Sequence, residues 1–534
     1  MQVVGKKVSR GDFLKLSGAG VAGAALLGTA GCGGGGGGNQ GGGGGGGGNT
    51  ITVGAPQEPS ILNPYITGGD QAVTSDVTNG VLQQLMQVTP DLSNLNESFQ
   101  PVLLEETPEV VSEDPFVLEM RLREGITFSD GEALTSDDVR FTYETVMNPD
   151  WDIISREGWE LVENFETPDE RTVRLTFSEP YAPWRIMMTS AILPRHVYEG
   201  ENFNEVANND ITGSGPFVIE EWNKGQDLTI IRNENFWGEA AGLERITFRF
   251  ITDTNSLIAA LEAGEVDFIN PPPDIGLSDR LEGISGTTLQ IEAGTTWEHL
   301  AFQLENVDNL KIRQAIAYGI NRQQIIQEVL QGEVPPLNSV LVPEQEQFYE
   351  PAWEQYSQDQ ERASQLVEEA QAEGAPTTYR LSSTSGEQLR ETLEQIVQQQ
   401  LEAVGITIEI DNSAASTFFG QVTPEGTFEI GEWAWLTFPD PRLTELFSAE
   451  GGQNYYNYES EEATQLILES DRTLDQQQRA ELLKQAQTVM AEDLPLIPLF
   501  QRPVYYAFNE SLSGPQVNPT VAGPFWNVGE WTLE

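Results

Sequence analysis

Residues 121–141, RLREGITFSDGEALTSDDVRF, say more about the fold than any other stretch of the sequence. They begin at the end of an alternating apolar and polar segment, residues 117–122, which is typical of a half-buried strand. Phe-Ser-Asp-Gly at 128–131 is a turn signal. Thr135, with an acid three residues later, is typical of a helix N-terminus. The stretch therefore predicts a strand, a turn and a helix in immediate succession.

The rest of the chain after residue 49 has the same mixed character. Apolar residues recur at helical spacing in residues 312–320, 393–404 and 482–490, and alternation at 406–410 predicts a strand. Gly405, between a helical pattern and a strand pattern, stands where a helix C-cap glycine is expected. The body is too long for one simple core, so the sequence predicts an α/β protein of two or three domains.

The N-terminal sequence has the features of an export signal. A basic patch at residues 6–10 precedes an apolar run at 16–30, which is short for a membrane-spanning helix of roughly 20 residues. Thr29-Ala30-Gly31-Cys32 resembles a bacterial lipobox, with Thr29 in place of the usual Leu. Residues 1–32 are therefore predicted to be a signal peptide and lipobox, with Cys32, the one cysteine of the chain, as the lipid anchor.

Residues 33–49 are almost entirely glycine. Such a segment has no side chains to bury and large backbone freedom. As a flexible coil it would span roughly 22 Å. Its place directly after Cys32 predicts a tether between a membrane anchor and a globular body.

The composition is strongly acidic, with 83 Asp and Glu against 28 Lys and Arg and a formal net charge of −55. Nucleic acid is excluded as a partner, because its recognition needs clustered Lys and Arg. Acid spread along the whole chain favours adaptation to high ionic strength, since salt screens self-repulsion. A functional acidic surface is the alternative.

The sequence contains few of the residues and motifs that are typical of catalytic sites. Two histidines, His196 and His299, and the single Cys32 cannot form a multi-histidine metal site. No nucleophile elbow, phosphate-binding loop or zinc-protease motif is present. We therefore expect no enzyme activity, no cofactor and no metal. A hydrolase that uses paired carboxylates remains as an alternative.

Aromatic residues are dense around 433–441, and tyrosines follow at 455–458. In a strand, Trp433 and Trp435 would share one face. Aromatic faces with a few polar groups suit a ligand cleft. Packing of large residues in the core is the alternative for each of these positions.

Several blocks together resemble the family 5 extracellular solute-binding proteins, the oligopeptide and dipeptide receptors of ABC importers. The blocks occur in the family order and span the chain from about residue 51 to its end. They lie at residues 121–141, 213–217, 231–238, 260–267, 313–322 and 495–500.

This resemblance implies a two-lobed, class II periplasmic-binding-protein-like α/β fold with an extra domain, which closes on its ligand by a hinge. It also implies a first lobe assembled from separate parts of the chain. The expected divisions are 50–80, 210–290 and 495–534 for the core of lobe 1, 81–209 for the additional domain on lobe 1, and 291–494 for lobe 2.

The resemblance also points to ligand-binding residues. Many family members carry Asp-Tyr-Pro-Asp-Pro after a Trp-rich strand, and in peptide receptors the first Asp binds the α-amino group of the ligand. Here Thr437 replaces that Asp, whereas Asp440 is retained. A hydroxyl cannot neutralise a buried ammonium. The predicted ligand-binding residues are Trp297, Trp433, Trp435, Thr437, Asp440 and Tyr455.

The resemblance thus implies a receptor that captures short peptides and delivers them to a permease driven by ATPase subunits. It would act outside the cell membrane as a lipid-anchored monomer. Thr437 motivates an alternative ligand, such as an oligosaccharide, an opine-like compound or another polar solute. Nickel is disfavoured by the scarcity of histidine. A surface adhesion protein of the same fold is a further alternative.

Overall fold

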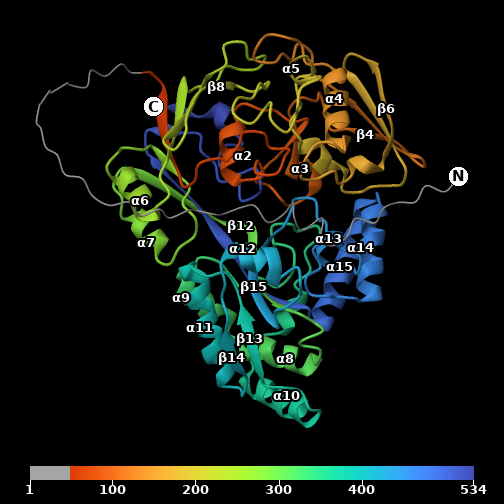
Figure 1. Ribbon diagram of the computed structural model, residues 1–534, viewed down its shortest axis with the longest axis vertical. Helices are drawn as coiled ribbons and strands as arrows, with labels where there is room; N and C mark the ends of the chain where they lie inside the picture. Colours follow the sequence, from red (N-terminus) through yellow and green to blue (C-terminus); the bar gives the residue numbers. More distant parts are fainter. Residues whose placement is uncertain (1–47) are drawn as a thin grey trace, which may run out of the picture.

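The structure is a computed structural model that describes residues 48–534, and it shows two bodies joined by a pair of long strands (Figure 1). We call residues 48–293 and 503–534 the upper body, and residues 297–501 the lower body. The predicted signal peptide, the lipid anchor Cys32 and all but the last two residues of the predicted tether lie outside the described residues.

One ten-stranded sheet runs through both bodies, in the order β14-β13-β15-β12-β16-β11-β1-β10-β9-β8. β1 pairs in parallel with β10 and β11 at the upper end, and β13 pairs in parallel with β14 and β15 at the lower end. The strands are β1 (Thr50–Ala55), β8 (Phe217–Asn223), β9 (Asp227–Arg232), β10 (Arg245–Phe250), β11 (Phe268–Ile269), β12 (Thr287–Phe302), β13 (Thr378–Ser382), β14 (Thr407–Ile410), β15 (Ile430–Leu436) and β16 (Leu496–Asn509).

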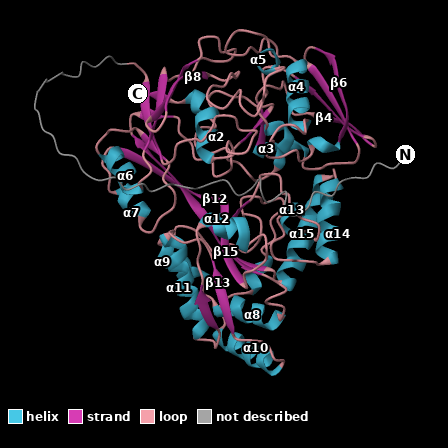
Figure 2. Cartoon of the chain, viewed as in Figure 1, coloured by secondary structure: helices cyan, strands magenta, loops and turns pink. Residues whose placement is uncertain are grey.

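β12 and β16 are the antiparallel pair that crosses between the bodies (Figure 2). Their register shifts between Ala293, opposite Pro503, and Trp297, opposite Gln501. An irregularity of this kind bends a strand and increases its local twist. The sheet therefore changes direction where the chain passes from one body to the other.

The stretch that opened the sequence analysis lies in a smaller sheet of the upper body, with the order β4-β5-β7-β6. The predicted strand is β5 (Phe116–Arg121), and the predicted helix is α4 (Ser136–Met147). The backbone N–H of Thr135 donates to Oδ2 of Asp138 at 2.8 Å, which completes a capping box. The strand, turn and helix are thus confirmed.

The remaining elements of the upper body are short; α3 lies near α2, whereas α6 and α7 lie apart at the lower left of the upper body (Figure 1). These remaining elements are α2 (Ala72–Thr78), β2 (Met86–Val88), α3 (Leu95–Ser98), β3 (Phe99–Pro101), β4 (Glu109–Glu113), η1 (Trp159–Leu161), β6 (Val162–Asp169), β7 (Thr172–Phe177), η2 (Trp184–Thr189), α5 (Arg195–Tyr198), α6 (Thr254–Glu262), α7 (Leu277–Glu282), β17 (Leu512–Ser513), η5 (Val528–Glu530) and β18 (Thr532–Leu533).

The lower body is mainly helical, and its three predicted helical patterns are confirmed as α8, α11 and α15. Gly405 follows α11 with φ +93, as expected for a glycine that ends a helix. The helices are α8 (Leu310–Gly319), α9 (Arg322–Leu330), η3 (Ala352–Gln355), α10 (Gln360–Ala372), α11 (Gln388–Glu402), α12 (Ala415–Thr417), η4 (Phe418–Val422), α13 (Thr444–Phe447), α14 (Glu461–Arg472) and α15 (Gln476–Asp493).

The two bodies also touch away from the connecting strands, where α13, α14 and α15 lie below α4 and its sheet (Figure 1). Arg442 pairs with Glu157, and the N–H of Ala182 donates to the carbonyl of Asp471 at 2.7 Å. The bodies are therefore in contact on this side.

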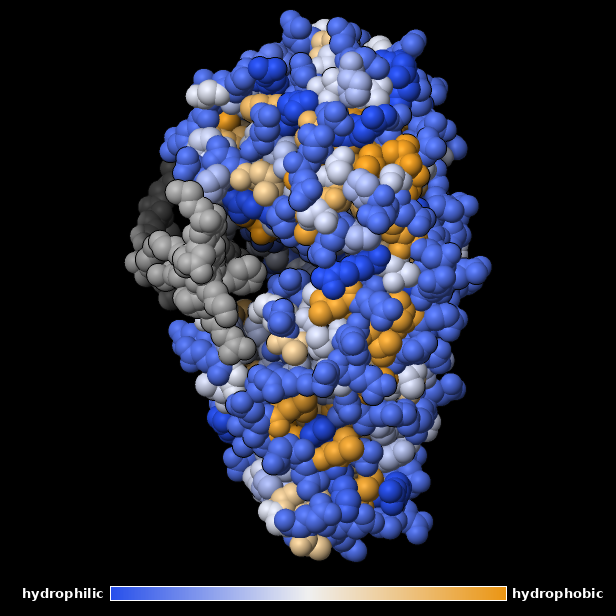
Figure 3. Space-filling model, turned by 90° about the vertical axis from the view of Figure 1, so that its right-hand side faces the viewer, coloured by the Kyte–Doolittle hydropathy of each residue, from blue (hydrophilic) through white to orange (hydrophobic). Residues whose placement is uncertain are grey.

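The visible side of the molecule in Figure 3 is largely hydrophilic, and its hydrophobic patches are small and scattered. Within residues 48–534, no helix combines the length and the apolar character needed to cross a membrane.

Candidate functional site

The Trp-rich strand predicted from the sequence is β15, which places Trp433 and Trp435 on one face. β12 runs beside it, with His299 opposite Trp433 and Trp297 opposite Trp435. Trp433 and Trp297 are each 1% exposed, whereas Trp435 is half-buried. The strand pairing thus gathers three of the predicted residues, but two of them lie in the core.

These aromatic side chains are joined by hydrogen bonds. The indole Nε1 of Trp435 donates to the hydroxyl of Tyr456 at 2.6 Å, and that hydroxyl lies 2.9 Å from Nε2 of His299. Burial lowers the pKa of His299 to about 3 and raises that of Tyr456, so both are uncharged at neutral pH. Tyr455 stacks on Trp435, with ring centroids 5.9 Å apart. The cluster is neutral, and the buried Nδ1 of His299 and Nε1 of Trp433 have no hydrogen-bond partner among the described residues.

Thr437 follows β15 and is 5% exposed. Its hydroxyl accepts a hydrogen bond from Nε1 of Trp297 at 2.9 Å, and its N–H donates to the carbonyl of Thr295 at 2.9 Å. The residue that replaces the expected acid is therefore held by the protein itself and supplies no charge.

Asp440 is fully buried and pairs with Nη1 of Arg479 at 2.5 Å. Arg479 is itself 1% exposed and also donates to the carbonyl of Pro441 at 2.8 Å. A buried charge needs a partner of this kind. Asp440 is thus neutralised within the lower body and holds the turn after β15 against α15.

A second buried ionic group lies beside the crossing of β12 and β16, and sequence reasoning missed it. Burial alone would raise the pKa of Glu298, but Arg502 and Arg390 outweigh it and lower that pKa to about 2. Burial and the charge of Glu298 raise the pKa of Glu432 well above its usual range. Arg390 lies 3.2 Å from Glu298 and 3.4 Å from Glu432. No sequence signal could have identified these acids among 83.

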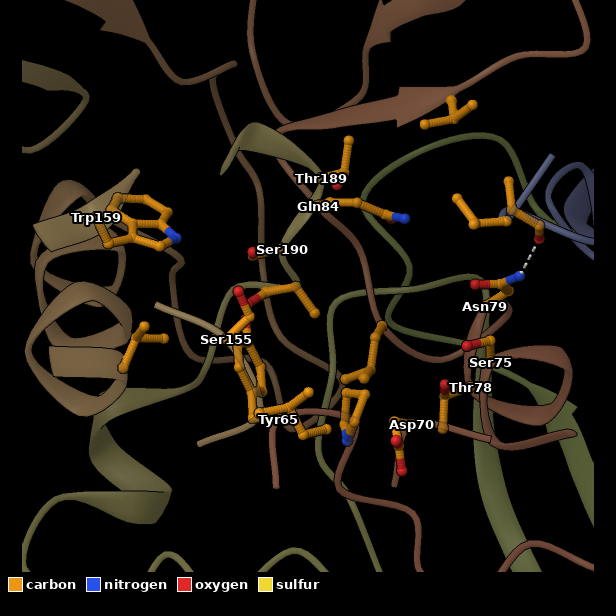
Figure 4. A pocket seen from close by; sticks show the side chains of 18 residues that line it. Tyr65, Asp70, Ser75, Thr78, Asn79, Gln84, Ser155, Trp159, Thr189 and Ser190 are labelled. Atoms are coloured by element: carbon orange, nitrogen blue, oxygen red, sulfur yellow. Dashed lines mark hydrogen bonds between the residues drawn. The ribbon is translucent and has the colours of Figure 1, made fainter. Parts of the chain in front are cut away.

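A cavity of about 360 Å³ lies in the upper body (Figure 4). This volume is within the range of small-ligand sites. Its lining is mostly uncharged and mixes apolar side chains with hydroxyls and amides. The polar lining residues are Tyr65, Asp70, Ser75, Thr78, Asn79, Gln84, Ser155, Thr189 and Ser190.

The rim of this cavity adjoins the lower body on two sides. Ser155 and Trp159 line it and flank Glu157, the partner of Arg442. Val521 lines it from another side, two residues after Pro519, whose carbonyl accepts the N–H of Thr295 at 2.9 Å.

Thr295 connects the rim to the lower body, because its carbonyl accepts the N–H of Thr437. Val521 and Ile154, which both line the cavity, are among the exposed large apolar residues, at 39% and 43%. The cavity is therefore near the surface where the bodies face each other.

A second cavity of about 660 Å³ lies in the upper body and shares four lining residues with the first. The shared residues are Asn79, Leu82, Gln84 and Ala522. Trp237 and Trp526 contribute aromatic surface to it. The two cavities are therefore adjacent and share part of their lining.

None of the six predicted ligand-binding residues lines either cavity. Their contact with a ligand stays a prediction, and the buried Trp297, Trp433 and Asp440 have structural roles in the described arrangement. The wall formed by α2 was missed because residues 72–79, AVTSDVTN, carry no feature that separates them from an ordinary short helix. Among residues 48–534, no cluster of three His, Cys, Asp or Glu is arranged to hold a metal.

Comparison with known proteins gives a consistent result. Residues 98–457 match the bacterial extracellular solute-binding proteins, family 5 Middle. The sequence is 24% identical over 512 residues to the oligopeptide-binding protein AppA of Bacillus subtilis strain 168, covering 90% of this chain and 91% of AppA.

Two solved structures share the fold over nearly the whole body. The periplasmic EDTA-binding protein EppA superposes with a TM-score of 0.82 at 23% identity, over 91% of this chain and 96% of EppA. AppA from Bacillus subtilis, in complex with a nonapeptide, gives a TM-score of 0.74 at 22% identity, over 91% of this chain and 99% of AppA. The predicted two-lobed fold is confirmed by these similarities.

Proposed function

This chain belongs to the bacterial extracellular solute-binding proteins of family 5, and we propose on that premise that it captures short peptides for an ABC importer. The family establishes an extracytoplasmic solute-binding protein. The peptide ligand is supported by the similarity to AppA, which is an oligopeptide-binding protein and has been solved with a nonapeptide.

The observation that carries the proposal is the cavity of about 360 Å³ whose rim adjoins the lower body. Its mixture of hydroxyls, amides and apolar side chains suits a peptide, which presents backbone N–H and C=O groups beside apolar side chains. The neutral aromatic pair of Trp435 and Tyr455 extends such a surface on the lower body.

Closure would occur about the irregular crossing of β12 and β16 near Ala293 and Trp297. A few residues at the ends of regular pairing can absorb the rotation of a hinge. The ligand can drive closure only by binding the closed state more tightly than the open state.

A different polar solute is the second candidate, and Thr437 is the observation that favours it. This position carries no acid, and its hydroxyl is already bonded to Trp297. EppA, which has the same fold, is an EDTA-binding protein. An oligosaccharide or an opine-like compound therefore belongs in the same binding experiments. A carboxylate-dependent hydrolase and a surface adhesion protein are less favoured.

The setting of the receptor completes the proposal. Cys32 would carry the lipid anchor, the glycine tether at 33–49 would keep the body near the membrane, and the closed monomer would dock on a permease with ATPase subunits. The net charge of −55 supports a protein adapted to high ionic strength. On this view its unfolding midpoint rises when salt is raised from 0.1 M to molar concentrations.

The test is ligand identification on the purified full-length protein at high salt. Native mass spectrometry would identify any co-purified ligand, and thermal shifts would be measured with di- to pentapeptides and with oligosaccharides. A peptide present at 100 times its Kd should stabilise the protein by about 2.7 kcal/mol. Stabilisation by an oligosaccharide and by none of the peptides would contradict the peptide proposal and favour the second candidate.

A further inference from the structure

We infer that the upper-body cavity binds a primary ammonium group of the ligand, with Asp70 as its counter-charge. This inference rests on the proposed function and specifies the ligand chemistry of that site. It places charge recognition on the α2 wall of the upper body, whereas Thr437 lies in the lower body.

Three side chains of this wall share one face of α2. Ser75, Thr78 and Asn79 stand at spacings of three and four residues, so they lie side by side along a helix. All three line the cavity, together with Asp70 just before the helix. Figure 4 shows these four residues along one side of the cavity, opposite Tyr65, Ser155 and Ser190.

The hydrogen bonds of this wall leave acceptors free. Nδ2 of Asn79 donates to the carbonyl of Ala522 at 2.7 Å, which leaves its Oδ1 turned toward the cavity (Figure 4). The hydroxyl of Thr78 donates to the carbonyl of Thr74 at 2.7 Å, so its oxygen can still accept. An ammonium has three N–H donors and no acceptor, and it therefore matches a wall of acceptors.

Asp70 supplies the charge. It is the one charged side chain among the lining residues of this cavity, and within residues 48–534 no cation lies within ion-pair distance of it. The turn that presents it is closely fitted: the N–H of Gly69 donates to the carbonyl of Ile66 at 2.9 Å, and a Cβ on Gly69 would lie 1.7 Å from the carbonyl oxygen of Asn63. The position of Asp70 is therefore set by the backbone.

Two buried carboxylates of the lower body are already paired, Asp440 with Arg479 and Glu298 with Arg390 and Arg502. Thr437 brings no charge. A ligand ammonium is stabilised by an opposite charge in contact with it. Asp70 can supply that charge from the exposed edge of the cavity, where its Oδ1 also accepts the N–H of Gly68 at 3.3 Å.

The experiment is a double-mutant cycle between the protein and its ligand. Isothermal titration at one fixed salt concentration compares tetra-alanine with N-acetyl-tetra-alanine, on wild type and on Asp70→Asn. We expect acetylation to weaken binding to wild type about fivefold, because Asp70 is exposed and a solvent-exposed ion pair contributes up to about 1 kcal/mol. Asp70→Asn should weaken binding of tetra-alanine by a similar factor and that of the acetylated peptide less than about twofold.

Asp210→Asn is the matched control, because Asp210 is an exposed acid of the upper body that lines neither cavity. It should leave both affinities unchanged. The inference is overturned, with the proposed function intact, if wild type binds both peptides equally or if Asp70→Asn keeps the preference of wild type. If wild type binds neither peptide but binds an oligosaccharide, the proposed function fails and the inference fails with it.

Discussion

Two regions differ in how their polar groups are used: residues 435–440 of the lower body, which we call the lower wall, and Asp70 with α2 of the upper body, which we call the upper wall. On the lower body, Trp435, Thr437 and Asp440 are bonded to other residues of that body. On the upper body, Asp70 and Asn79 present acceptors to a cavity. The comparison shows that the conspicuous Trp-rich motif has a structural role. The hydrogen-bond acceptors that remain free lie on and beside the short helix α2, which has no conspicuous sequence motif.

Removal of the cation from the lower wall should have the largest effect. Arg479→Met leaves Asp440 as an unpaired, fully buried charge. The free energy of unfolding should fall by about 3–5 kcal/mol, measured by chemical denaturation at pH 7.

Arg472→Met is its control, because Arg472 and its partner Glu179 are 56% and 42% exposed. It should change the unfolding free energy by less than about 1 kcal/mol. Equal effects of the two substitutions would contradict the neutralised lower wall.

Glu394 is a buried acid of the lower body with incomplete pairing, and it provides a pH test. Burial and the charge of Glu391 raise its pKa to about 7, although Asn412 donates to it at 2.7 Å. The native state therefore holds an extra proton between about pH 4.5 and 7, so this group's contribution to stability is lost as pH rises through that window and is constant above it.

Glu394→Gln should remove this contribution. Relative to wild type, its unfolding free energy should be nearly unchanged at pH 4.5 and higher by about 1–3 kcal/mol at pH 8. Glu402→Gln, at an exposed position of the same helix, should give a difference that does not depend on pH. A pH-independent effect of Glu394→Gln would show that Glu394 is ionised at low pH.

Trp435 tests whether the lower wall touches the ligand. It is half-buried and stacked on Tyr455, whereas Trp433 is 1% exposed. Trp435→Ala should weaken peptide binding about tenfold, because aromatic contact surface is lost. Trp433→Phe should lower the unfolding free energy and leave affinity within about threefold. Unchanged affinity in Trp435→Ala would assign Trp435 to the core.

Arg442 tests the contact between the two walls, and its effect should be the smallest. It pairs with Glu157 across the bodies and is 15% exposed. Arg442→Ala should disfavour the closed arrangement by about 1 kcal/mol and weaken binding about fivefold. Small-angle scattering of the ligand-free protein should then show a larger radius of gyration. An unchanged radius together with unchanged affinity would exclude a role in closure.

Sequence reasoning reached the fold because its signals are local or come from ordered family blocks. The capping pair of Thr135 and Asp138 and the glycine at Gly405 each depend on residues a few positions apart. Sequence reasoning reached the site less well, since the burial of Trp433 depends on its pairing with β12, more than a hundred residues away in the chain. The α2 wall was missed because a free acceptor becomes visible only when its neighbours are placed.

By itself the sequence determined the family, the two-lobed α/β fold and the absence of an acid at Thr437. These follow from residue identity, order and charge. Only the tertiary structure showed that Asp440 is paired with Arg479 and that Glu298 and Glu432 belong to one buried ionic group. It also showed that Asp70 lines a cavity. The physical reason is that the state of a polar group depends on its partners and its exposure to water, and folding supplies both from distant parts of the chain.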